Sequence, residues 1–239
     1  MPLAAVRGTV RRYKNPPTVH IHQEGDGEKS IEISDGVISP LPNAGTRTIN
    51  YCFGASGSGK STWVSRFIDE FLQKNPKANI YYISRLAEDK AFEDFGVKRL
   101  KIDESLLEEP VSNDDFPEGS LLIFDDIDTI QPKAVNEAVH NLLRDVLNCG
   151  RHRNLSACIT SHMGSDYKRT REILNECHNI VCFPHGSSAQ QIRYVLKTYA
   201  GLSNGDVMKL LKLPSRWVAV RRHYPPAVMY EGGAYLLSK

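Results

Sequence analysis

The sequence predicts an α/β fold with a mostly parallel central sheet and helices on both of its faces. Two observations support this. Short apolar runs alternate with helical patterns along most of the chain, and one such run leads through a glycine-rich loop directly into a helix. The 239 residues, 41% hydrophobic and 24% charged, are enough to bury a core. The ranges that we expect to form the strands of this sheet are 48–53, 80–83, 97–102, 121–127, 155–160 and 179–183.

The two ends of the chain have sequence patterns that differ from that of the central sheet. Residues 1–30 form a basic and polar arm with no acid among the first fourteen positions. Asp35-Gly36 lies in the alternating run 30–39 and predicts a short N-terminal hairpin. The segment 217–230 is typical of closing strands at the C-terminus. We therefore expect an arm over 1–30 and a single domain over 31–239.

Three helices can be placed from periodicity and end signals. An apolar stripe runs from Val135 to Leu147, with Pro132 suited to the first turn and Gly150 to the end. Ser187 with Gln190, and later Ser203 with Asp206, have the spacing of a capping box ahead of apolar periodic residues. These signals predict helices over about 132–147, 188–199 and 204–211.

Charge, cysteine content and apolar run length exclude several classes of protein. The net charge of +2 is too small for the whole chain to bind nucleic acid by charge alone. Five cysteines without a framework spacing indicate reduced thiols. No run approaches the ~20 apolar residues of a transmembrane helix, and the first residues lack a signal-peptide core, so we expect neither segment.

The glycine-rich loop after 48–53 has the pattern G-x-x-x-x-G-K-[ST] in the strand-loop-helix setting that this motif requires. Its backbone N–H groups and the helix N-terminus would surround phosphate oxygens. We expect Lys60 to bind the β- and γ-phosphates and the Ser61 hydroxyl to ligate Mg²⁺. The predicted nucleotide-binding residues are Gly54, Ala55, Ser56, Gly57, Ser58, Gly59, Lys60, Ser61 and Thr62.

Two acids end the apolar run 121–124 and complete the predicted site. Carboxylates at the carboxyl end of a parallel strand face the ligand crevice. We expect Asp125 to hold Mg²⁺ and Asp126 to orient and activate the attacking water, with Asp128 as an alternative. Two predicted strands separate Lys60 from Asp125 in the sequence, which favours a sheet with a strand inserted between the phosphate strand and the acidic strand. Guanine-specific and transporter-type signatures are absent, so ATP is the expected nucleotide.

Together with these motifs, the stretch NCGRHRNLSACITSH and the compact size make the sequence similar to the FtsK–HerA group of DNA-translocating ATPases. Within that group it resembles the genome-packaging ATPases of large, poxvirus-like DNA viruses. The resemblance spans about residues 48–183 and implies a RecA/FtsK-like sheet and a ring of subunits. It further implies that an arginine of one subunit reaches the γ-phosphate bound by its neighbour. The matching position is Arg151, with Arg153 as the second choice.

The sequence departs from this group at the predicted γ-phosphate sensor. The strand end that usually offers a glutamine here carries Ser161 and His162, which are our sensor candidates. A zinc site of Cys149, His152, Cys158 and His162 is not expected. The intervening strand would hold His152 and Cys158 roughly 20 Å apart. We expect no structural zinc.

Basic residues in one segment suggest where DNA would bind. Lys168, Arg169 and Arg171, near Tyr167, are candidates for sequence-independent contacts with the backbone of double-stranded DNA, and further basic residues follow after 197. As alternatives, these residues form a solvated surface, or segment 167–171 acts as the lid of a kinase.

The leading hypothesis is an ATPase that translocates DNA and packages a double-stranded viral genome. A P-loop kinase for nucleosides or nucleotides is the alternative, and a module that binds ATP without turnover is a third possibility. A packaging role implies location in the viral factory of the host cytoplasm or in the virion. It also implies contact with capsid or membrane-associated virion proteins.

Overall fold

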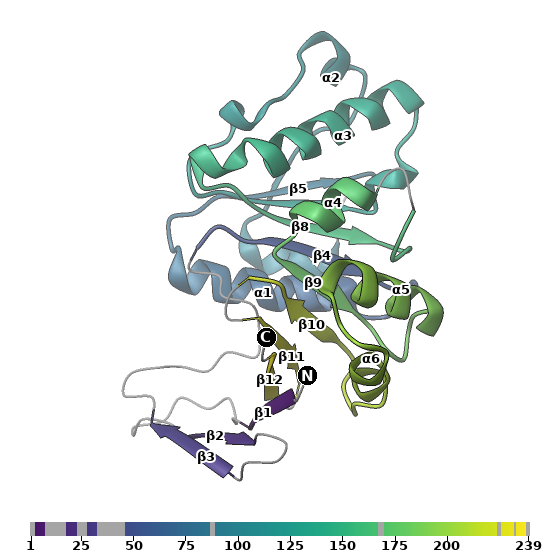
Figure 1. The fold of residues 1–239 in the computed structure, drawn as a ribbon. Coiled ribbons are helices and arrows are strands. Elements are labelled where there is room, and N and C mark those ends of the chain that lie inside the picture. Colours follow the sequence, from purple (N-terminus) through teal and green to yellow (C-terminus); the bar gives the residue numbers. More distant parts are fainter. Residues whose placement is uncertain are drawn as a thin grey trace.

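A computed structural model shows that the chain forms one twelve-stranded mixed sheet with helices on both faces (Figure 1). The strand order among the described residues is β3-β2-β1-β12-β11-β10-β9-β4-β8-β7-β5-β6. The predicted α/β class with a mostly parallel central sheet is therefore confirmed. The structure describes residues 3–7, 18–22, 28–32, 46–86, 89–166, 170–223, 226–231 and 233–237.

Six parallel strands form the half of the sheet that carries the predicted motifs. Strand β8 lies between β4 and β7 and pairs with both in parallel. A strand is thus inserted between β4 and β7, as predicted, but it is β8, which follows β7 in the sequence. The two strands that precede β7 in the sequence, β5 and β6, lie on the far side of β7 from β4. The bounds are β4 Ile49–Phe53, β5 Ile80–Ser84, β6 Lys98–Arg99, β7 Leu121–Asp125, β8 Ser156–Ser161 and β9 Asn179–Cys182.

Antiparallel strands extend the sheet on the β9 side. The predicted C-terminal closing strands are confirmed as β10 and β11, and β12 pairs in turn with β1 near the N-terminus. The predicted turn at Asp35-Gly36 lies outside the described residues. The division at residue 31 stays a prediction. These strands are β10 Val218–Arg221, β11 Ala227–Tyr230, β12 Gly233–Leu237, β1 Leu3–Arg7, β2 Thr18–His22 and β3 Glu28–Glu32.

Helices cover the two faces of the parallel half unequally. Helix α1 packs on one face with η1, while α3, α4, α5 and α6 pack on the other, and Figure 1 shows α1 and α3 on opposite sides of β8. None of the described helices has both the length and the apolar character needed to cross a bilayer. The bounds are α1 Lys60–Lys74, α2 Ser105–Glu108, α3 Lys133–Asn148, α4 Thr170–Glu176, α5 Ala189–Ala200, α6 Asn204–Leu211, η1 Lys90–Phe95, η2 Asn113–Asp115, η3 Ile127–Thr129 and η4 Gly150–Arg153.

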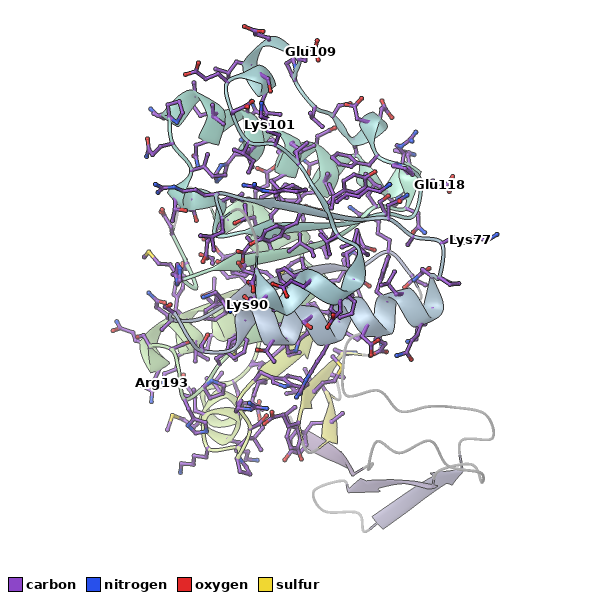
Figure 2. The ribbon with its side chains drawn as sticks, turned by 180° about the vertical axis from the view of Figure 1, so that it is seen from behind. Lys77, Lys90, Lys101, Glu109, Glu118 and Arg193 are labelled. Atoms are coloured by element: carbon purple, nitrogen blue, oxygen red, sulfur yellow. The ribbon has the colours of Figure 1, made fainter. Side chains whose placement is uncertain are left out.

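Side chains alternate between the two faces of each strand, as a pleated sheet requires. In β4, Tyr51 and Phe53 join the core beneath α3 to α6, while Cys52 joins the core beneath α1. Charged side chains such as Lys101 and Glu109 point outward at the periphery (Figure 2). The central parallel strands are therefore buried on both faces, and the polar residues Ser84, Asp125 and Ser161 stand at their carboxyl ends.

Two local predictions need correction. The expected strand 97–102 contains only the two-residue β6, because the chain turns away after pairing with Tyr81 and Tyr82 of β5. The expected cap Ser187 lies one residue before the actual N-cap of α5, Ser188, which makes no side-chain capping bond. The cap at Ser203 is confirmed, since its hydroxyl accepts from the backbone N–H of Asp206 at 3.1 Å.

Candidate nucleotide site

The glycine-rich loop joins β4 to α1 at the carboxyl edge of the parallel strands. Gly57 and Gly59 have φ angles of 74° and 104°, which glycine adopts without the steric cost of a side chain. Gly54 donates to the carbonyl of Ser161 at 3.1 Å, and Ala55 donates to that of Gly186. The loop is thus tied to the ends of β8 and β9, and the N-terminus of α1 opens beside it.

Close packing fixes the first residue of the loop. A Cβ added at Gly54 would lie 2.7 Å from Ser58 Oγ, 2.9 Å from Ser187 Oγ and 3.0 Å from the ring of Phe183. The two serine hydroxyls can rotate away from such a Cβ, whereas the Phe183 ring would have to shift by a few tenths of an ångström. The packing therefore favours glycine at position 54, in addition to the backbone freedom used at Gly57 and Gly59.

Lys60 folds back over its own loop. Its side chain is mostly buried, and Nζ donates to the carbonyl of Gly54 at 2.9 Å and to that of Ala55 at 3.4 Å. It also lies 3.3 Å from Nδ1 of His162, at the end of β8. The ammonium group is thus centred in the loop, where phosphate oxygens would replace the carbonyl partners.

Asp125 ends β7 and is held by side chains from neighbouring strands. Its Oδ2 accepts from the hydroxyl of Tyr82 at 2.9 Å and from that of Ser84 at 3.4 Å. Its Oδ1 accepts from Thr160 Oγ1 at 2.6 Å. Burial raises the pKa of Tyr82, and the charge of Asp125 raises it further, so the phenol remains a donor. Asp125 is therefore a fixed, buried acceptor at the carboxyl edge.

Asp126 follows in a left-handed conformation with a φ angle of 44°. This conformation turns its side chain toward β8, where Oδ2 lies 2.8 Å from Nε2 of His162. Its other oxygen, Oδ1, is buried without a hydrogen-bond partner among the described residues. Burial raises the pKa of Asp126 above its ordinary value of 3.8, and Asp125 adds to this effect, whereas Lys60 and His162 oppose it. Asp126 thus has the stronger basicity that a proton acceptor needs.

His162 connects the loop to the acid. A lysine ammonium has only donors, so Nδ1 of a neutral His162 accepts from Lys60, and Nε2–H donates to Asp126. Ser161 is engaged differently, because its Oγ accepts from the backbone N–H of Met163. Of the two sensor candidates, His162 therefore bridges Lys60 and Asp126, while Ser161 stabilises the turn after β8.

The structure places the candidate arginines at the opposite edge of the sheet. Arg151 and Arg153 belong to η4, which precedes the amino end of β8, and six strand residues span about 20 Å. Arg151 is exposed and makes no side-chain hydrogen bond or ion pair with the described part of the chain. Arg153 instead donates to the carbonyl of Phe116 at 2.8 Å and pairs with Asp114. Arg151 therefore does not lie near its own Lys60.

The DNA candidates are only partly described. Tyr167, Lys168 and Arg169 lie outside the described residues, and Arg171 is exposed on the first turn of α4. Among the later basic residues, Arg222 donates to the carbonyl groups of Leu174, Asn175 and Cys177. This arginine therefore caps carbonyl groups at the C-terminal end of α4.

The residues that sequence reasoning missed surround the acids and the loop. Tyr82, Ser84 and Thr160 orient Asp125, and Phe183 packs against Gly59 at 3.6 Å from where its Cβ would lie. Ser84 ends β5, Thr160 is the second-last residue of β8 and Phe183 follows β9, so their positions at strand ends could have indicated them. Tyr82 lies in the middle of β5 and had no such signal. The described residues contain no group of three or more His, Cys, Asp or Glu side chains that could hold a metal ion.

The sheet order, the phosphate loop and the acidic strand end define the fold of a P-loop NTPase. The chain is similar to the genome packaging NTPase B204 from Sulfolobus turreted icosahedral virus 2, solved with ATP-gammaS. That match has a TM-score of 0.50 and 14% identity and covers 77% of this chain and 97% of that one. It is also similar to the cytoplasmic domain of the Thermomonospora curvata type VII secretion ATPase EccC. There the TM-score is 0.52 and the identity 14%, over 77% of this chain and 25% of that one.

These likenesses establish the fold, and the sequence establishes the family. The chain belongs to the same family as the "Uncharacterized protein V3" of Sputnik virophage. The two are 35% identical over 239 residues, which cover 99% of this chain and 95% of that protein. No protein-family model matches the chain.

Proposed function

We propose that this protein is an ATP-hydrolysing DNA translocase that packages a double-stranded viral genome. The observation that carries the proposal is the pair Lys60 and Asp126, joined through His162 across the inserted strand β8. The solved NTPases of this fold include one described as genome packaging and bound to an ATP analogue. A role in the viral factory or in the virion, with capsid or membrane-associated virion proteins as partners, follows from this function.

The described residues fit a magnesium ion bound together with the nucleotide. Asp125 and the Ser61 hydroxyl offer the hard oxygen ligands that Mg²⁺ prefers. Because both oxygens of Asp125 already accept hydrogen bonds, the carboxylate suits contact through metal-bound water. Bound there, the ion would neutralise charge on the β- and γ-phosphates.

The side chains then divide the work of hydrolysis. Lys60 leaves its carbonyl partners and binds phosphate oxygens, where its charge stabilises the developing phosphoryl charge. Asp126 orients the water that attacks the γ-phosphorus and accepts its proton as the bond to the ADP oxygen breaks. His162 holds Asp126 through Nε2–H and senses the γ-phosphate through the displaced Lys60.

Measurements of ATP hydrolysis with and without double-stranded DNA test this function. Lys60→Ala should abolish Mg·ATP binding or turnover, and Asp126→Asn should bind ATP but not hydrolyse it. The variant Lys77→Ala, which removes one positive charge from the surface, is the matched control and should hydrolyse ATP at the parent rate. Parent turnover in both site variants would reject the assignment. Transfer of phosphate to a nucleoside instead of water would establish the alternative, a P-loop kinase.

Arg151 is proposed as a finger that acts on the neighbouring subunit of a ring. Its exposure at the edge opposite its own loop supports this role, because only another subunit's nucleotide is within its reach. An arginine finger contributes ~10³-fold or more to turnover. Mixing inactive Arg151→Ala and Lys60→Ala subunits should restore hydrolysis at interfaces that contain one intact loop and one intact finger. Co-assembled mixtures that stay inactive would refute the finger.

The DNA contact is proposed for Lys168, Arg169 and Arg171, without base recognition. Replacing all three by Ala should weaken duplex binding similarly across sequences and flatten its salt dependence. Unchanged DNA-stimulated hydrolysis over several salt concentrations would remove this segment from the DNA path.

A further inference from the structure

A polar cavity opens at the amino edge of the parallel strands, at the end of β4 opposite the phosphate loop. It lies where β4 and β9 begin and where the antiparallel strand β10 ends, and its volume is about 230 Å³. The length of β4 separates the cavity from the loop by roughly 17 Å, at about 3.3 Å per residue. The cavity is therefore distinct from the candidate nucleotide site.

Four basic side chains line the cavity, and none of the lining residues that the structure describes is acidic. They are Arg47, His178, Arg221 and His223. Arg47 is held in place, because its Nε donates to the carbonyl of Leu155 at 2.9 Å. Its Nη2 donates to the carbonyl groups of Val146 and Leu147 at 2.9 and 3.1 Å. Arg47 Nη1 makes no hydrogen bond with the described part of the chain, so this fixed guanidinium group retains donors for a ligand.

Two histidine rings meet in the wall of the cavity. The rings of His178 and His223 lie edge to face, with centroids 4.4 Å apart. Nδ1 of His178 accepts from the backbone N–H of Ile49 at 3.3 Å, so the neutral ring carries its proton on Nε2. Burial lowers the pKa of His178 to about 4. The charges of His223, Arg47 and Arg222 add to this effect, while a hydrogen bond with the backbone of Arg47 opposes it.

The charges around the cavity are mostly positive. Burial is the main cause that lowers the pKa of Arg47; Glu176 opposes this effect, and Arg151 adds to it. Arg222 lies close by, where it donates to carbonyl groups at the end of α4. Together with Arg221, four guanidinium groups thus stand against the one carboxylate of Glu176. An anion that enters the cavity meets a positive potential.

We propose that this cavity binds a phosphate group. Guanidinium groups bind phosphate oxygens through paired, charge-assisted hydrogen bonds. The volume equals that of about seven water molecules at ~30 Å³ each, so a phosphate group fits with part of its hydration shell. The phosphate is either free or part of a nucleic-acid backbone, since both present the same oxygens. The inference is independent of the proposed function, because no lining residue belongs to the nucleotide site.

Histidine ring signals in NMR spectra of the full chain test this proposal. His178 and His223 report on the cavity, and the variants His178→Gln and His223→Gln assign their signals. His162 reports on the loop, because its Nδ1 lies 3.3 Å from Lys60 Nζ. The loop is first saturated with Mg·ADP, and inorganic phosphate is then titrated against sodium chloride at equal ionic strength.

Phosphate should shift the signals of His178 and His223 and leave that of His162 unchanged. Because an anion favours the protonated ring, phosphate should also raise the pKa of His178 above its value in chloride. The concentration at which the shifts are half complete gives the affinity.

Arg221→Gln and Arg99→Gln form a matched pair of variants. Each removes one guanidinium group from a strand, but Arg99 is exposed on β6, at the far end of the parallel half of the sheet. Arg221→Gln should weaken phosphate binding roughly tenfold, because a charge-assisted hydrogen bond is lost, and Arg99→Gln should leave it unchanged. Should Arg221→Gln fail to fold, His223→Gln, which changes an exposed side chain, should weaken binding several-fold.

A short DNA duplex distinguishes the two sources of the phosphate. If the duplex shifts the same signals and inorganic phosphate reverses the shifts, the group belongs to the DNA backbone. If inorganic phosphate shifts them and the duplex does not, the site takes free phosphate. Both results support the site.

Two results would overturn the site. In the first, neither ligand moves the signals of His178 and His223 beyond the effect of chloride. In the second, Arg99→Gln weakens phosphate binding as much as Arg221→Gln. Failure of Mg·ADP to shift the signal of His162 would count against the proposed function alone, since the signals at the cavity are read separately.

Discussion

Replacing Thr160 by valine removes one hydroxyl at the centre of the acidic site. Thr160 lies next to the end of β8 and is 1% exposed. Its hydroxyl donates to Asp125 Oδ1 at 2.6 Å and accepts from the backbone N–H of Asp126 at 3.2 Å. Valine keeps the size, the branching and the strand preference of threonine. The substitution therefore isolates the two hydrogen bonds.

The structure sets the size of the expected loss. A hydrogen bond to a charged group contributes about 1.5–3 kcal/mol, and a donor left without a partner costs about 1–3 kcal/mol when buried. Asp125 keeps Tyr82 and Ser84 as donors, and the N–H of Asp126 is only partly buried, so values near the lower ends apply. We expect Thr160→Val to lower the free energy of unfolding by about 3 kcal/mol. That is a large share of the 5–15 kcal/mol typical of a domain.

Urea denaturation of the full chain measures this loss, with Thr160→Ser as the matched control. Serine keeps the hydroxyl and removes one methyl group, which costs about 1 kcal/mol. The valine variant should also hydrolyse ATP more slowly, because Asp125 loses the donor that orients it. A valine variant as stable as the parent, or a serine variant destabilised as much as valine, would refute the reasoning.

Three further predictions concern the loop, the acid and a buried histidine. Gly54→Ala should weaken Mg·ATP binding by several-fold in calorimetry, because its Cβ would press on the Phe183 ring at 3.0 Å and displace the hydroxyls of Ser58 and Ser187; parent affinity would contradict this. Because burial raises the pKa of Asp126 above its ordinary value of 3.8, kcat should decrease as the pH is lowered, with an apparent pKa above 3.8. An acid limb at or below 3.8 would count against Asp126 as the base. Burial lowers the pKa of His178 from 6.5 to about 4, so the unfolded chain binds more protons between these values. The Tm should therefore decrease as pH falls from 6.5 to about 4, and His178→Gln should flatten this dependence.

The sequence was sufficient to locate the chemistry but not the partners that orient it. The loop 54–62 and the acids Asp125 and Asp126 are each contiguous, so their spacing alone predicts their place at strand ends. Tyr82, Ser84 and Thr160 come from two other strands and meet Asp125 only because β5, β7 and β8 are neighbours in the sheet. Chain order does not give sheet order, which is also why β8 was not foreseen as the inserted strand.

The predicted boundaries of two elements were wrong, at the strand expected over 97–102 and at the N-terminus of α5. The apolar positions of 97–102 suggested a full strand, yet only Lys98 and Arg99 pair with β5. At α5 the serine with capping-box spacing, Ser187, instead lies against the phosphate loop, with Oγ 2.9 Å from where a Cβ of Gly54 would lie. Its hydroxyl oxygen is buried there without a hydrogen-bond partner among the described residues, and α5 begins one residue later than the capping-box spacing predicts.

The position of Arg151 sets a geometric condition on the proposed ring. The phosphate loop lies at the carboxyl edge of β4, while η4 lies at the amino edge of β8, and the two strands are parallel neighbours. A finger that acts on the next subunit therefore requires the amino edge of one sheet to face the carboxyl edge of its neighbour. Such a contact joins two different surfaces, and repeating it gives a ring when the rotation between subunits closes, whereas a two-fold dimer would pair identical edges. In a two-fold dimer formed through either edge, Arg151 would remain far from every nucleotide. The finger and the ring thus depend on the same head-to-tail arrangement of subunits.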